Sequence, residues 1–168
     1  MTLALSIRQP WASLIVLPET AYVPLDQQIT PKDIENRTWE TRVRGPILIH
    51  AAKSMTWDEY LDGLSFAYRI NPKLVEALGV LTVSASMGFI VDQTKQHITR
   101  IDLAHGLSDC PLPRGGIIGS VNLAACLYRS PSPWFQGPYG FVLLDPKPLP
   151  FVPLSGRLGF FDVPGVLP

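Results

Sequence analysis

The chain of 168 residues is 46% hydrophobic and 17% charged, which is enough apolar material for one core and favours a single domain over residues 1–168. Its 14 basic and 14 acidic residues cancel, so net charge draws it neither to nucleic acid nor to a membrane, and a polynucleotide would need a local basic patch. The chain starts without the features of a signal peptide, and no run approaches about 18 apolar residues. We therefore expect a cytoplasmic protein with no membrane association, whose two cysteines, Cys110 and Cys126, stay reduced.

The charges are unevenly distributed along the chain. Residues 32–53 hold five basic and three acidic residues, residues 54–109 hold four basic and seven acidic, and residues 110–168 hold four basic and two acidic. If the first and last of these segments meet in the fold, they form one basic face; the alternative is an ordinary solvated surface of mixed charge. The three histidines lack the paired spacing of a zinc site, so the sequence predicts no metal and implies no cofactor.

The first part of the chain predicts strands around one short helix. Residues 3–7 form an apolar run typical of a strand, and a helix over residues 10–17 begins at a proline, which suits a first helical turn. Residues 17–31 form a long loop punctuated by prolines. Two strands follow: residues 33–39 are polar on both faces, whereas residues 45–51 are strongly apolar.

Two helices and a hairpin are predicted in the middle of the chain. Thr56 fits the N-cap of the first helix, because acidic residues follow in the first turn and apolar residues then recur at helical spacing. Pro72 begins a second, shorter helix that Gly79 ends. Residues 88–103 indicate a hairpin that projects from the domain, with its turn near residues 93–96.

The last third of the chain predicts strands. Residues 117–128 alternate between an apolar face that includes Ile117 and a second face that includes Cys126. Two more strands are expected at residues 139–144 and 156–163. Short strands thus carry most of the pattern and helices are few, which predicts a mixed α+β fold: a small β-barrel with helices packed beside it.

The densest set of polar and aromatic side chains lies in residues 32–46, KDIENRTWETRVRGP. If residues 33–39 form a strand, Glu35, Arg37 and Trp39 share one face, because side chains repeat every second residue. A guanidinium can pair with two acceptors of a phosphate or a base edge, and an indole offers a plane for stacking. The alternative is a plain Glu35–Arg37 ion pair on a solvated strand.

Two further groups are candidates for the same site. His50 and Lys53 follow an apolar strand, where a histidine acts as a base only if a partner orients it and is otherwise a satisfied core residue. Trp134 and Tyr139 lie in SPSPWFQGPYGF, a proline-rich loop that either walls a base-sized pocket or caps a barrel mouth. The sequence has no Gly-x-Ser-x-Gly elbow, the usual motif of a serine hydrolase, and no glycine-rich loop of the kind that binds nucleotide phosphates.

Four stretches resemble an ASCH domain (activating signal cointegrator homology domain), a group within the PUA-like superfamily: LSIRQPWA, KDIENRTWETRVRGPILIHAAK, GGIIGSVNLAAC and SPWFQGPYGFVL. The resemblance covers about residues 3–163, with variable insertions at residues 17–31 and 80–112. It implies a PUA-like pseudobarrel with helices beside it and a cleft that the superfamily associates with RNA or modified nucleobases.

The resemblance also implies roles for single residues. The string Gly-x-Lys-x-x-Glu/Thr-x-Arg of the family falls on Lys32, Glu35 and Arg37, with Thr30 in place of the glycine, which reaches φ > 0 more freely. Some relatives deacylate N4-acetylcytidine with the lysine and a threonine, but the threonine position here holds Glu35, which has no hydroxyl. Other relatives are associated with ribonuclease activity, for which the candidates here are Lys32, Arg37, His50 and Lys53.

The first of these stretches places Arg8, Gln9 and Trp11 at the edge of the implied cleft. Gln9 can recognise a base edge through its paired donor and acceptor, and the start of the helix after Pro10 offers N–H groups to a phosphate. We therefore interpret this polar stretch inside an apolar run as the edge of a binding site.

Together these observations predict a protein that binds RNA or a nucleotide-sized ligand in a basic and aromatic cleft. The predicted ligand-binding residues are Arg8, Gln9, Trp11, Lys32, Glu35, Arg37, Trp39, Lys53, Trp134 and Tyr139. One alternative is a ribonuclease or amidohydrolase with Lys32, Glu35 and His50 as catalytic residues. Another is a protein-interaction module of the coactivator type, which the neutral net charge favours.

Overall fold

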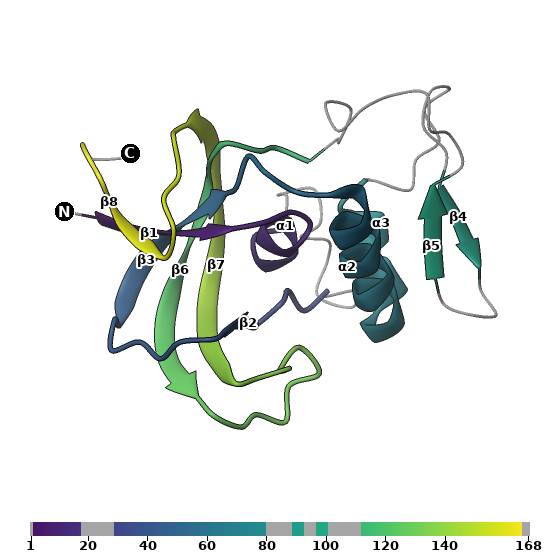
Figure 1. Ribbon diagram of the computed structural model, residues 1–168, viewed down its shortest axis with the longest axis horizontal. Helices are drawn as coiled ribbons and strands as arrows, with labels where there is room; N and C mark the ends of the chain where they lie inside the picture. The colour runs from purple at the N-terminus through teal and green to yellow at the C-terminus, as the bar shows by residue number, and fades with distance from the viewer. Residues whose placement is uncertain (1, 18–28, 80–88, 93–96, 101–111, 166–168) are drawn as a thin grey trace.

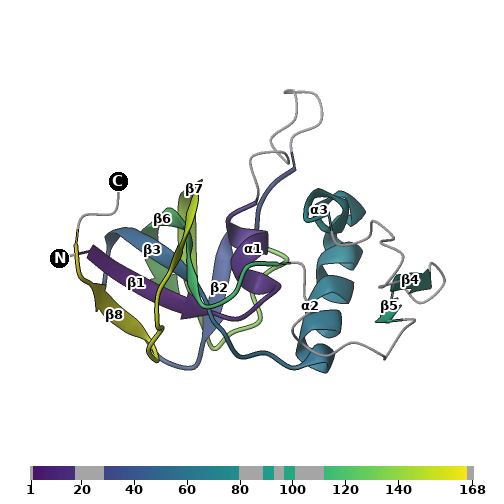
Figure 2. The same cartoon turned by 90° about the horizontal axis from the view of Figure 1, so that it is seen from above.

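The computed structural model describes residues 2–17, 29–79, 89–92, 97–100 and 112–165. Within these residues the chain forms a six-stranded sheet, a two-stranded sheet and three helices, which confirms the predicted α+β class. The six-stranded sheet occupies one end of the molecule and the longer helices the other, with the first helix between them (Figures 1 and 2).

The six-stranded sheet has the order β2-β7-β6-β3-β1-β8. Its strands are β1 (Thr2–Ile7), β2 (Ile34–Arg37), β3 (Gly45–Ala51), β6 (Gly116–Leu127), β7 (Tyr139–Pro153) and β8 (Phe160–Val163). β1 runs parallel to β3, and the other neighbouring strands are antiparallel. Because β2 and β8 are both edges, the sheet is open and is not a closed barrel, and the PUA-like pseudobarrel expected from the sequence stays a prediction.

The open sheet nevertheless curls strongly. Phe160 of β8 stacks on Phe141 of β7 with ring centroids 6.0 Å apart, although three strands separate β7 from β8 within the sheet. On the same open side, Arg37 of β2 donates a hydrogen bond of 2.8 Å to the backbone oxygen of Ser6 in β1. Side-chain contacts therefore join each edge strand to the far part of the sheet: β2 contacts β1, and β8 contacts β7.

The helices begin and end where local signals place them. α1 (Trp11–Ile15) is shorter than predicted, and α2 (Trp57–Ile70) and α3 (Pro72–Ala77) follow one another directly. Thr56 is the N-cap of α2 and forms a capping box with Glu59. The Thr56 hydroxyl accepts a hydrogen bond from the Glu59 N–H, and the Glu59 carboxylate accepts one from the Thr56 N–H. Gly79 ends the helical segment with a φ of +68°, as a glycine after a helix does.

The predicted hairpin is also confirmed at the level of its strands. β4 (Phe89–Asp92) and β5 (His97–Arg100) pair antiparallel, while the expected turn at residues 93–96 lies outside the described residues. The hairpin lies next to α2 at the end of the molecule farthest from the six-stranded sheet (Figures 1 and 2).

Bulges in the β6–β7 pair explain two differences from the sequence prediction. β7 continues nine residues past the predicted end at residue 144, and the register shifts of the pair accommodate the prolines that suggested a break. The same shifts break the simple alternation of β6. Ile117 packs with Leu48 and Phe161 in one cluster, while Cys126, expected on the second face, packs against the cluster that contains Val121.

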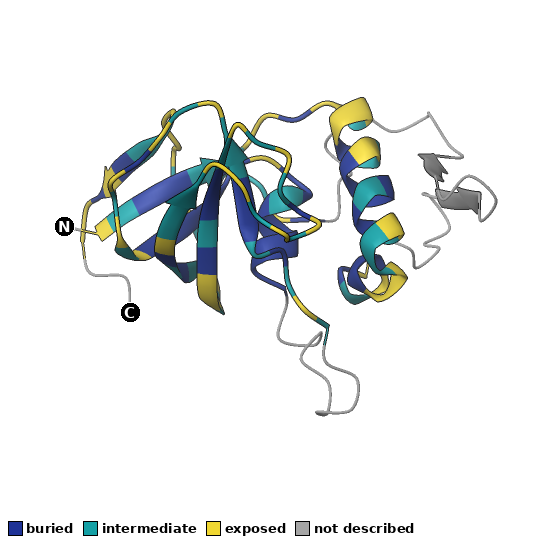
Figure 3. Ribbon diagram, turned by 90° about the horizontal axis from the view of Figure 1, so that it is seen from below, coloured by how far each residue is buried: buried dark blue, intermediate teal, exposed yellow. Residues whose placement is uncertain are grey.

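The core consists of two large clusters and a small one. One large cluster lies between α1 and the inner side of the sheet, and the other joins α1 to α2 and α3. Figure 3 shows the buried residues along the strands, with the exposed residues on loops and on one side of α2. Of the helices described, none combines the length and hydrophobicity that a membrane crossing requires. Cys126 is a free thiol, and Cys110 lies outside the described residues.

We expect Gly63→Ala to destabilise the fold even though alanine is the better helix former. Helix propensity alone predicts a gain of about 1 kcal/mol. A Cβ at Gly63, however, would lie 2.7 Å from the ring of Pro10 and 3.2 Å from Trp11, so overpacking should cost about 1–3 kcal/mol. Urea unfolding measures the sign, with the exposed neighbour Asp62→Ala as the control. A more stable Gly63→Ala protein would contradict this close approach of α2 to α1.

Candidate functional site

Two cavities share a wall on the open side of the curled sheet. The larger cavity, of about 660 Å³, is lined by Ser6, Ile7, Arg8, Trp11, Glu35, Arg37, His50, Ala52, Lys53, Ser54, Gly156, Arg157, Leu158 and Gly159. The smaller cavity, of about 210 Å³, is lined by Trp11, Lys32, Glu35, Asn36, Phe66, Trp134 and Gln136. Trp11 and Glu35 line both cavities and so form the wall between them.

We call the larger one the cationic cavity, because four basic side chains and one acidic side chain line it among the described residues. Arg37 and Lys53 come from the first basic segment of the sequence and Arg157 from the last, so the fold brings these two segments together. Arg8 lies at the exposed edge and forms an ion pair with Glu59 at the start of α2. The charged groups of Lys53 and Arg157 are exposed and make no ion pair with any described residue.

Glu35 lies between two cations. Its Oε2 atom is 2.6 Å from Nζ of Lys32, and its Oε1 atom is 3.2 Å from Nη2 of Arg37. Glu35 and Arg37 share a face of β2, as the two-residue repeat predicts, whereas Lys32 reaches the same carboxylate from the residues before the strand. Glu35 and Lys32 are both buried. Burial lowers the pKa of the Lys32 ammonium, and the neighbouring Glu35 carboxylate opposes that shift.

Arg37 retains donors that the protein does not use. Its Nη2 atom serves both Glu35 and the backbone oxygen of Ser6, while its buried Nε–H has no hydrogen-bond partner among the described residues. An unpaired buried donor is uncommon, because it forfeits the hydrogen bond that it makes with water in the unfolded chain. Because this Nε–H is itself buried, what Arg37 offers to an anion in the cavity is its positive charge.

His50 is oriented from both sides of its ring. Its Nδ1 atom lies 2.9 Å from Oγ of Ser6, and its Nε2 atom lies 2.9 Å from the backbone oxygen of Leu154. Phe161 packs edge-on against the ring, and a side chain at Gly156 would collide with it. The orienting partner that the sequence left open is therefore present, and both Ser6 and His50 line the cationic cavity.

We call the smaller one the aromatic cavity, because rings from three separate elements line it. Trp11 of α1 lies edge-on to Phe66 of α2, and Phe66 is 5.8 Å from Trp134, which follows β6. Asn36 fixes the loop that carries Trp134: its Nδ2 donates to the Trp134 backbone oxygen, and its Oδ1 accepts from the N–H of Gln136. The side-chain amide of Gln136 is exposed and makes no hydrogen bond with any described residue.

Gln9 does not line either cavity, contrary to its expected role at the edge of the cleft. It is fully buried, and its Nε2 donates to Oγ of Ser13 and to the backbone oxygen of Pro113. Its Oε1 accepts from the N–H of Ser13, and the N–H of Ala12 donates to the backbone oxygen of Arg8. The amide and the first N–H groups of α1 that the sequence assigned to a ligand are therefore used within the protein.

Two predicted aromatic contacts also lie outside both cavities. Trp39 follows the end of β2 and packs edge-on against Phe141 at 5.1 Å and Phe160 at 5.6 Å. Tyr139 pairs with Arg37 in the sheet, but its ring packs against Tyr128. Of the ten predicted binding residues, the structure brings together Arg8, Trp11, Lys32, Glu35, Arg37, Lys53 and Trp134.

Sequence reasoning missed several residues that line the site, among them Ser6, Asn36, Phe66, Gln136 and Arg157. Three of them lie inside stretches that the family resemblance covered, but nothing marked them as different from their neighbours. Phe66 was interpreted as one of the core residues of a helix. Arg157 was placed in a strand over residues 156–163, whereas the strand begins at Phe160 and the preceding residues form the edge of the cationic cavity.

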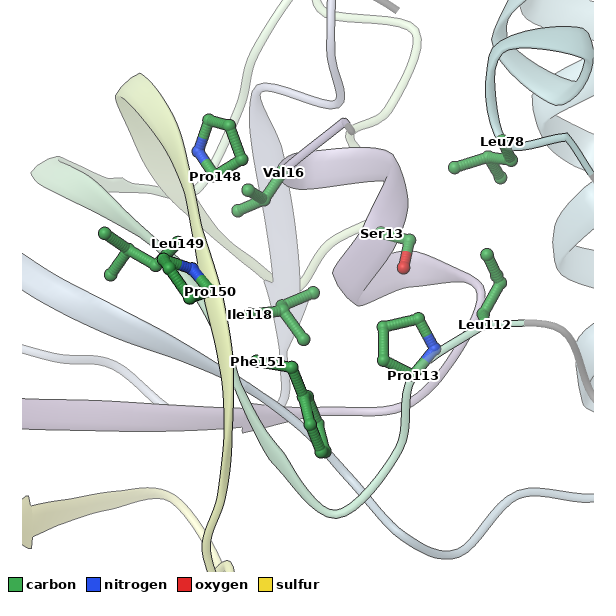
Figure 4. Close-up of a pocket in the computed structure, with 10 residues that line it drawn as sticks. All are labelled: Ser13, Val16, Leu78, Leu112, Pro113, Ile118, Pro148, Leu149, Pro150 and Phe151. Atoms are coloured by element: carbon green, nitrogen blue, oxygen red, sulfur yellow. The ribbon is translucent and has the colours of Figure 1, made fainter. Parts of the chain in front are cut away.

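A third cavity, of about 520 Å³, lies between α1 and the later part of β7 (Figure 4). It is lined by Ser13, Val16, Leu78, Leu112, Pro113, Ile118, Pro148, Leu149, Pro150 and Phe151. No charged side chain is among these described residues, and the one hydroxyl, that of Ser13, already accepts from Gln9. Its chemistry differs from that of the paired cavities.

The chain matches no protein-family model and no curated protein. Within the described ranges, no group of three or more His, Cys, Asp or Glu residues is arranged to hold a metal ion.

We expect Glu35→Ala to destabilise the protein by about 3–5 kcal/mol, because it leaves the buried Lys32 and the partly buried Arg37 without their shared counterion. Chemical denaturation measures this free energy of unfolding. Glu76→Ala, an exposed carboxylate on α3, is the control and should change stability by less than about 0.5 kcal/mol. A loss below about 1 kcal/mol for Glu35→Ala would mean that water reaches and solvates the charge cluster.

Proposed function

We propose that the protein binds single-stranded RNA, or a nucleotide-sized piece of it, with a phosphate in the cationic cavity and a base in the aromatic cavity. The observation that carries this proposal is the wall that the two cavities share. Trp11 and Glu35 line both, so a ligand that fills both cavities must carry an anionic group next to a flat ring. A nucleotide has this combination.

The cationic cavity supplies the phosphate contacts. Lys53 and Arg157 line it without an ion pair to any described residue, and Arg37 adds a third positive charge. Arginine and lysine that bind phosphate release condensed counterions, which makes affinity fall as salt rises. The volume of about 660 Å³ lies within the range of about 300–1,000 Å³ that is typical of ligand sites.

The aromatic cavity supplies the base contacts. Rings on several sides suit a base that is splayed out from its neighbours, which is the state in which proteins recognise single-stranded RNA by sequence. The free amide of Gln136 offers a donor and an acceptor to the base edge, the role that the sequence had assigned to Gln9. The small volume, about 210 Å³, favours one base and excludes a stacked pair.

We further propose that the chain is an ASCH domain with the PUA-like pseudobarrel fold. Three features support this assignment: the curled sheet with helices at one end, the Lys32–Glu35–Arg37 cluster on the family string, and a cavity beside the LSIRQPWA stretch. Binding fits the cluster better than amide hydrolysis by Lys32 and Glu35 does. Both oxygens of Glu35 are engaged by cations, so neither is free to take a proton from a substrate.

If phosphate is held in the cationic cavity, affinity for a short single-stranded RNA should fall steeply with salt. The slope of log affinity against log salt should become shallower by about 0.7 in each of Lys53→Ala and Arg157→Ala. Fluorescence anisotropy with a labelled oligonucleotide at several salt concentrations measures this. Lys73→Ala, an exposed lysine on α3 outside the cavity lining, is the control and should leave the slope unchanged. Absence of salt-dependent binding would favour a protein partner.

If Gln136 contacts the base, Gln136→Ala should change base preference without changing the salt slope. Competition between oligonucleotides that differ at a single unpaired position measures the preference. We expect the preferred base to lose about 1–3 kcal/mol of its discrimination, the usual contribution of a good two-bond contact. The matched control is Asn122→Ala, a polar side chain on β6 outside both cavities. If Gln136→Ala lowered the affinity equally for every base, Gln136 would not contribute to base recognition.

A further inference from the structure

A serine and a histidine that both line the cationic cavity form an oriented pair. The parallel register of β1 and β3 places Ser6 opposite His50, and their side chains meet at 2.9 Å between Oγ and Nδ1. A backbone oxygen only accepts hydrogen bonds, so the contact with the Leu154 oxygen requires the proton of a neutral His50 to lie on Nε2. Nδ1 is then an acceptor, and the Ser6 hydroxyl donates to it.

We propose that Ser6 is a nucleophile and His50 its general base, acting on a phosphate ester held in the cationic cavity. This inference rests on the proposed function, because it takes the same cavity to be a phosphate site. The pair has the arrangement that activates a serine: a base within hydrogen-bond distance of the hydroxyl and a third group that orients the base. Here a backbone oxygen is the orienting group, and the ring uses Nδ1, not Nε2, towards the serine.

The surroundings of the pair favour a reactive role over a purely structural one. Backbone ladder bonds already join β1 to β3 at this register, so the sheet needs no side-chain bond here. Ser6 is half-buried and lines the cavity, and Arg37 donates a hydrogen bond of 2.8 Å to the backbone oxygen of Ser6. His50 is buried between Phe161 and Gly156, which prevents its ring from turning away.

The electrophile is assigned as phosphorus because of the cations that line the cavity. A phosphate ester bears negative charge before the reaction and develops more on its oxygens during it, and Arg37, Lys53 and Arg157 are positioned to stabilise that charge. An uncharged carboxylic ester would gain much less from three cations. The favoured substrate class is therefore a phosphodiester.

The step balances as follows. Oγ of Ser6 forms a bond to phosphorus while its proton passes to Nδ1 of His50, and the bond from phosphorus to the leaving oxygen breaks. The leaving oxygen takes a proton from solvent water, which gives an alcohol and a phosphoserine diester. Water then attacks phosphorus and releases a proton to solvent, the bond to Oγ breaks, and Oγ recovers its proton from His50. The net reaction is hydrolysis of a phosphodiester to an alcohol and a phosphomonoester.

A fluorophosphonate probe tests the nucleophile directly, because attack by Oγ expels fluoride and leaves a stable adduct. Peptide mapping by mass spectrometry should place the adduct on Ser6 and not on Ser54, an exposed serine that lines the same cavity. His50→Gln keeps an N–H donor for Leu154 but lacks the base, so its labelling rate should fall by about 100-fold or more. Ser155→Ala, a change at an exposed serine outside the lining of the cationic cavity, should label at the rate of the unmodified protein.

Turnover is measured with bis(p-nitrophenyl) phosphate, whose leaving group needs no protonation. Release of p-nitrophenolate should be lost in Ser6→Ala and retained in Ser155→Ala, a change at an exposed serine outside the lining of the cationic cavity. If circular dichroism shows that His50→Gln is unfolded, the comparison of Ser6 with Ser54 in the unmodified protein still decides the matter. Labelling of Ser6 no faster than Ser54 would overturn the proposal and make the pair a structural hydrogen bond.

Protection by RNA separates this proposal from the one on which it rests. A single-stranded oligonucleotide that binds the cavity should slow labelling of Ser6, which supports both proposals. Rapid labelling that the oligonucleotide does not slow would support the nucleophile and count against RNA as the ligand. Salt-dependent RNA binding by a protein whose Ser6 stays unlabelled would overturn the nucleophile and leave the binding function standing.

Discussion

The carboxylate of Glu35, held between Lys32 and Arg37, is the interaction on which the site depends. Removing three charged groups from water is costly, and their mutual attraction roughly offsets that cost, so the cluster contributes geometry more than net stability. It holds Arg37 in the position from which the guanidinium reaches the backbone oxygen of Ser6 across the open side of the sheet. The same carboxylate forms part of the wall between the two cavities. One buried group therefore contributes both to the curl of the sheet, together with the Phe141–Phe160 stacking, and to the division of the site, together with Trp11.

The sequence predicts those parts of the fold that depend on local chemistry. The N-cap at Thr56, the start of a helix at Pro72 and its end near Gly79 are found where expected, because each depends on residues within one helical turn. The length of β7 was not predictable in this way. Its prolines are tolerated because the partner strand shifts register at bulges, and a bulge depends on two strands at once. The open curl of the sheet depends likewise on contacts between distant strands.

The site follows the same division between local and distant causes. The spacing of Glu35 and Arg37 on one strand face, with Lys32 just before it, was visible in the sequence because it needs only a two-residue repeat. The role of Gln9 was not visible, because its partner Pro113 is 104 residues away in the chain. A glutamine with a donor and an acceptor serves a base edge and a backbone oxygen equally well, so residue type alone does not decide between a ligand and the protein.

The zero net charge and the cationic cavity are compatible because acidic residues elsewhere balance the total charge. One acidic residue, Glu59, also pairs with a cation of the cavity. Glu59 closes the capping box of α2 with Thr56 and at the same time pairs with Arg8 at the exposed edge of the cavity. Arg8 is thereby held in place and partly neutralised, while Lys53 and Arg157 line the same cavity without an ion pair to any described residue. Cations outside the cavity, such as Arg69, Lys73 and Arg129, are balanced by acidic residues elsewhere on the surface, so the net charge of zero attracts long polyanions only weakly. In the proposed binding mode, a phosphate meets Lys53 and Arg157 together in the cationic cavity, and the neighbouring aromatic cavity contacts the base attached to it.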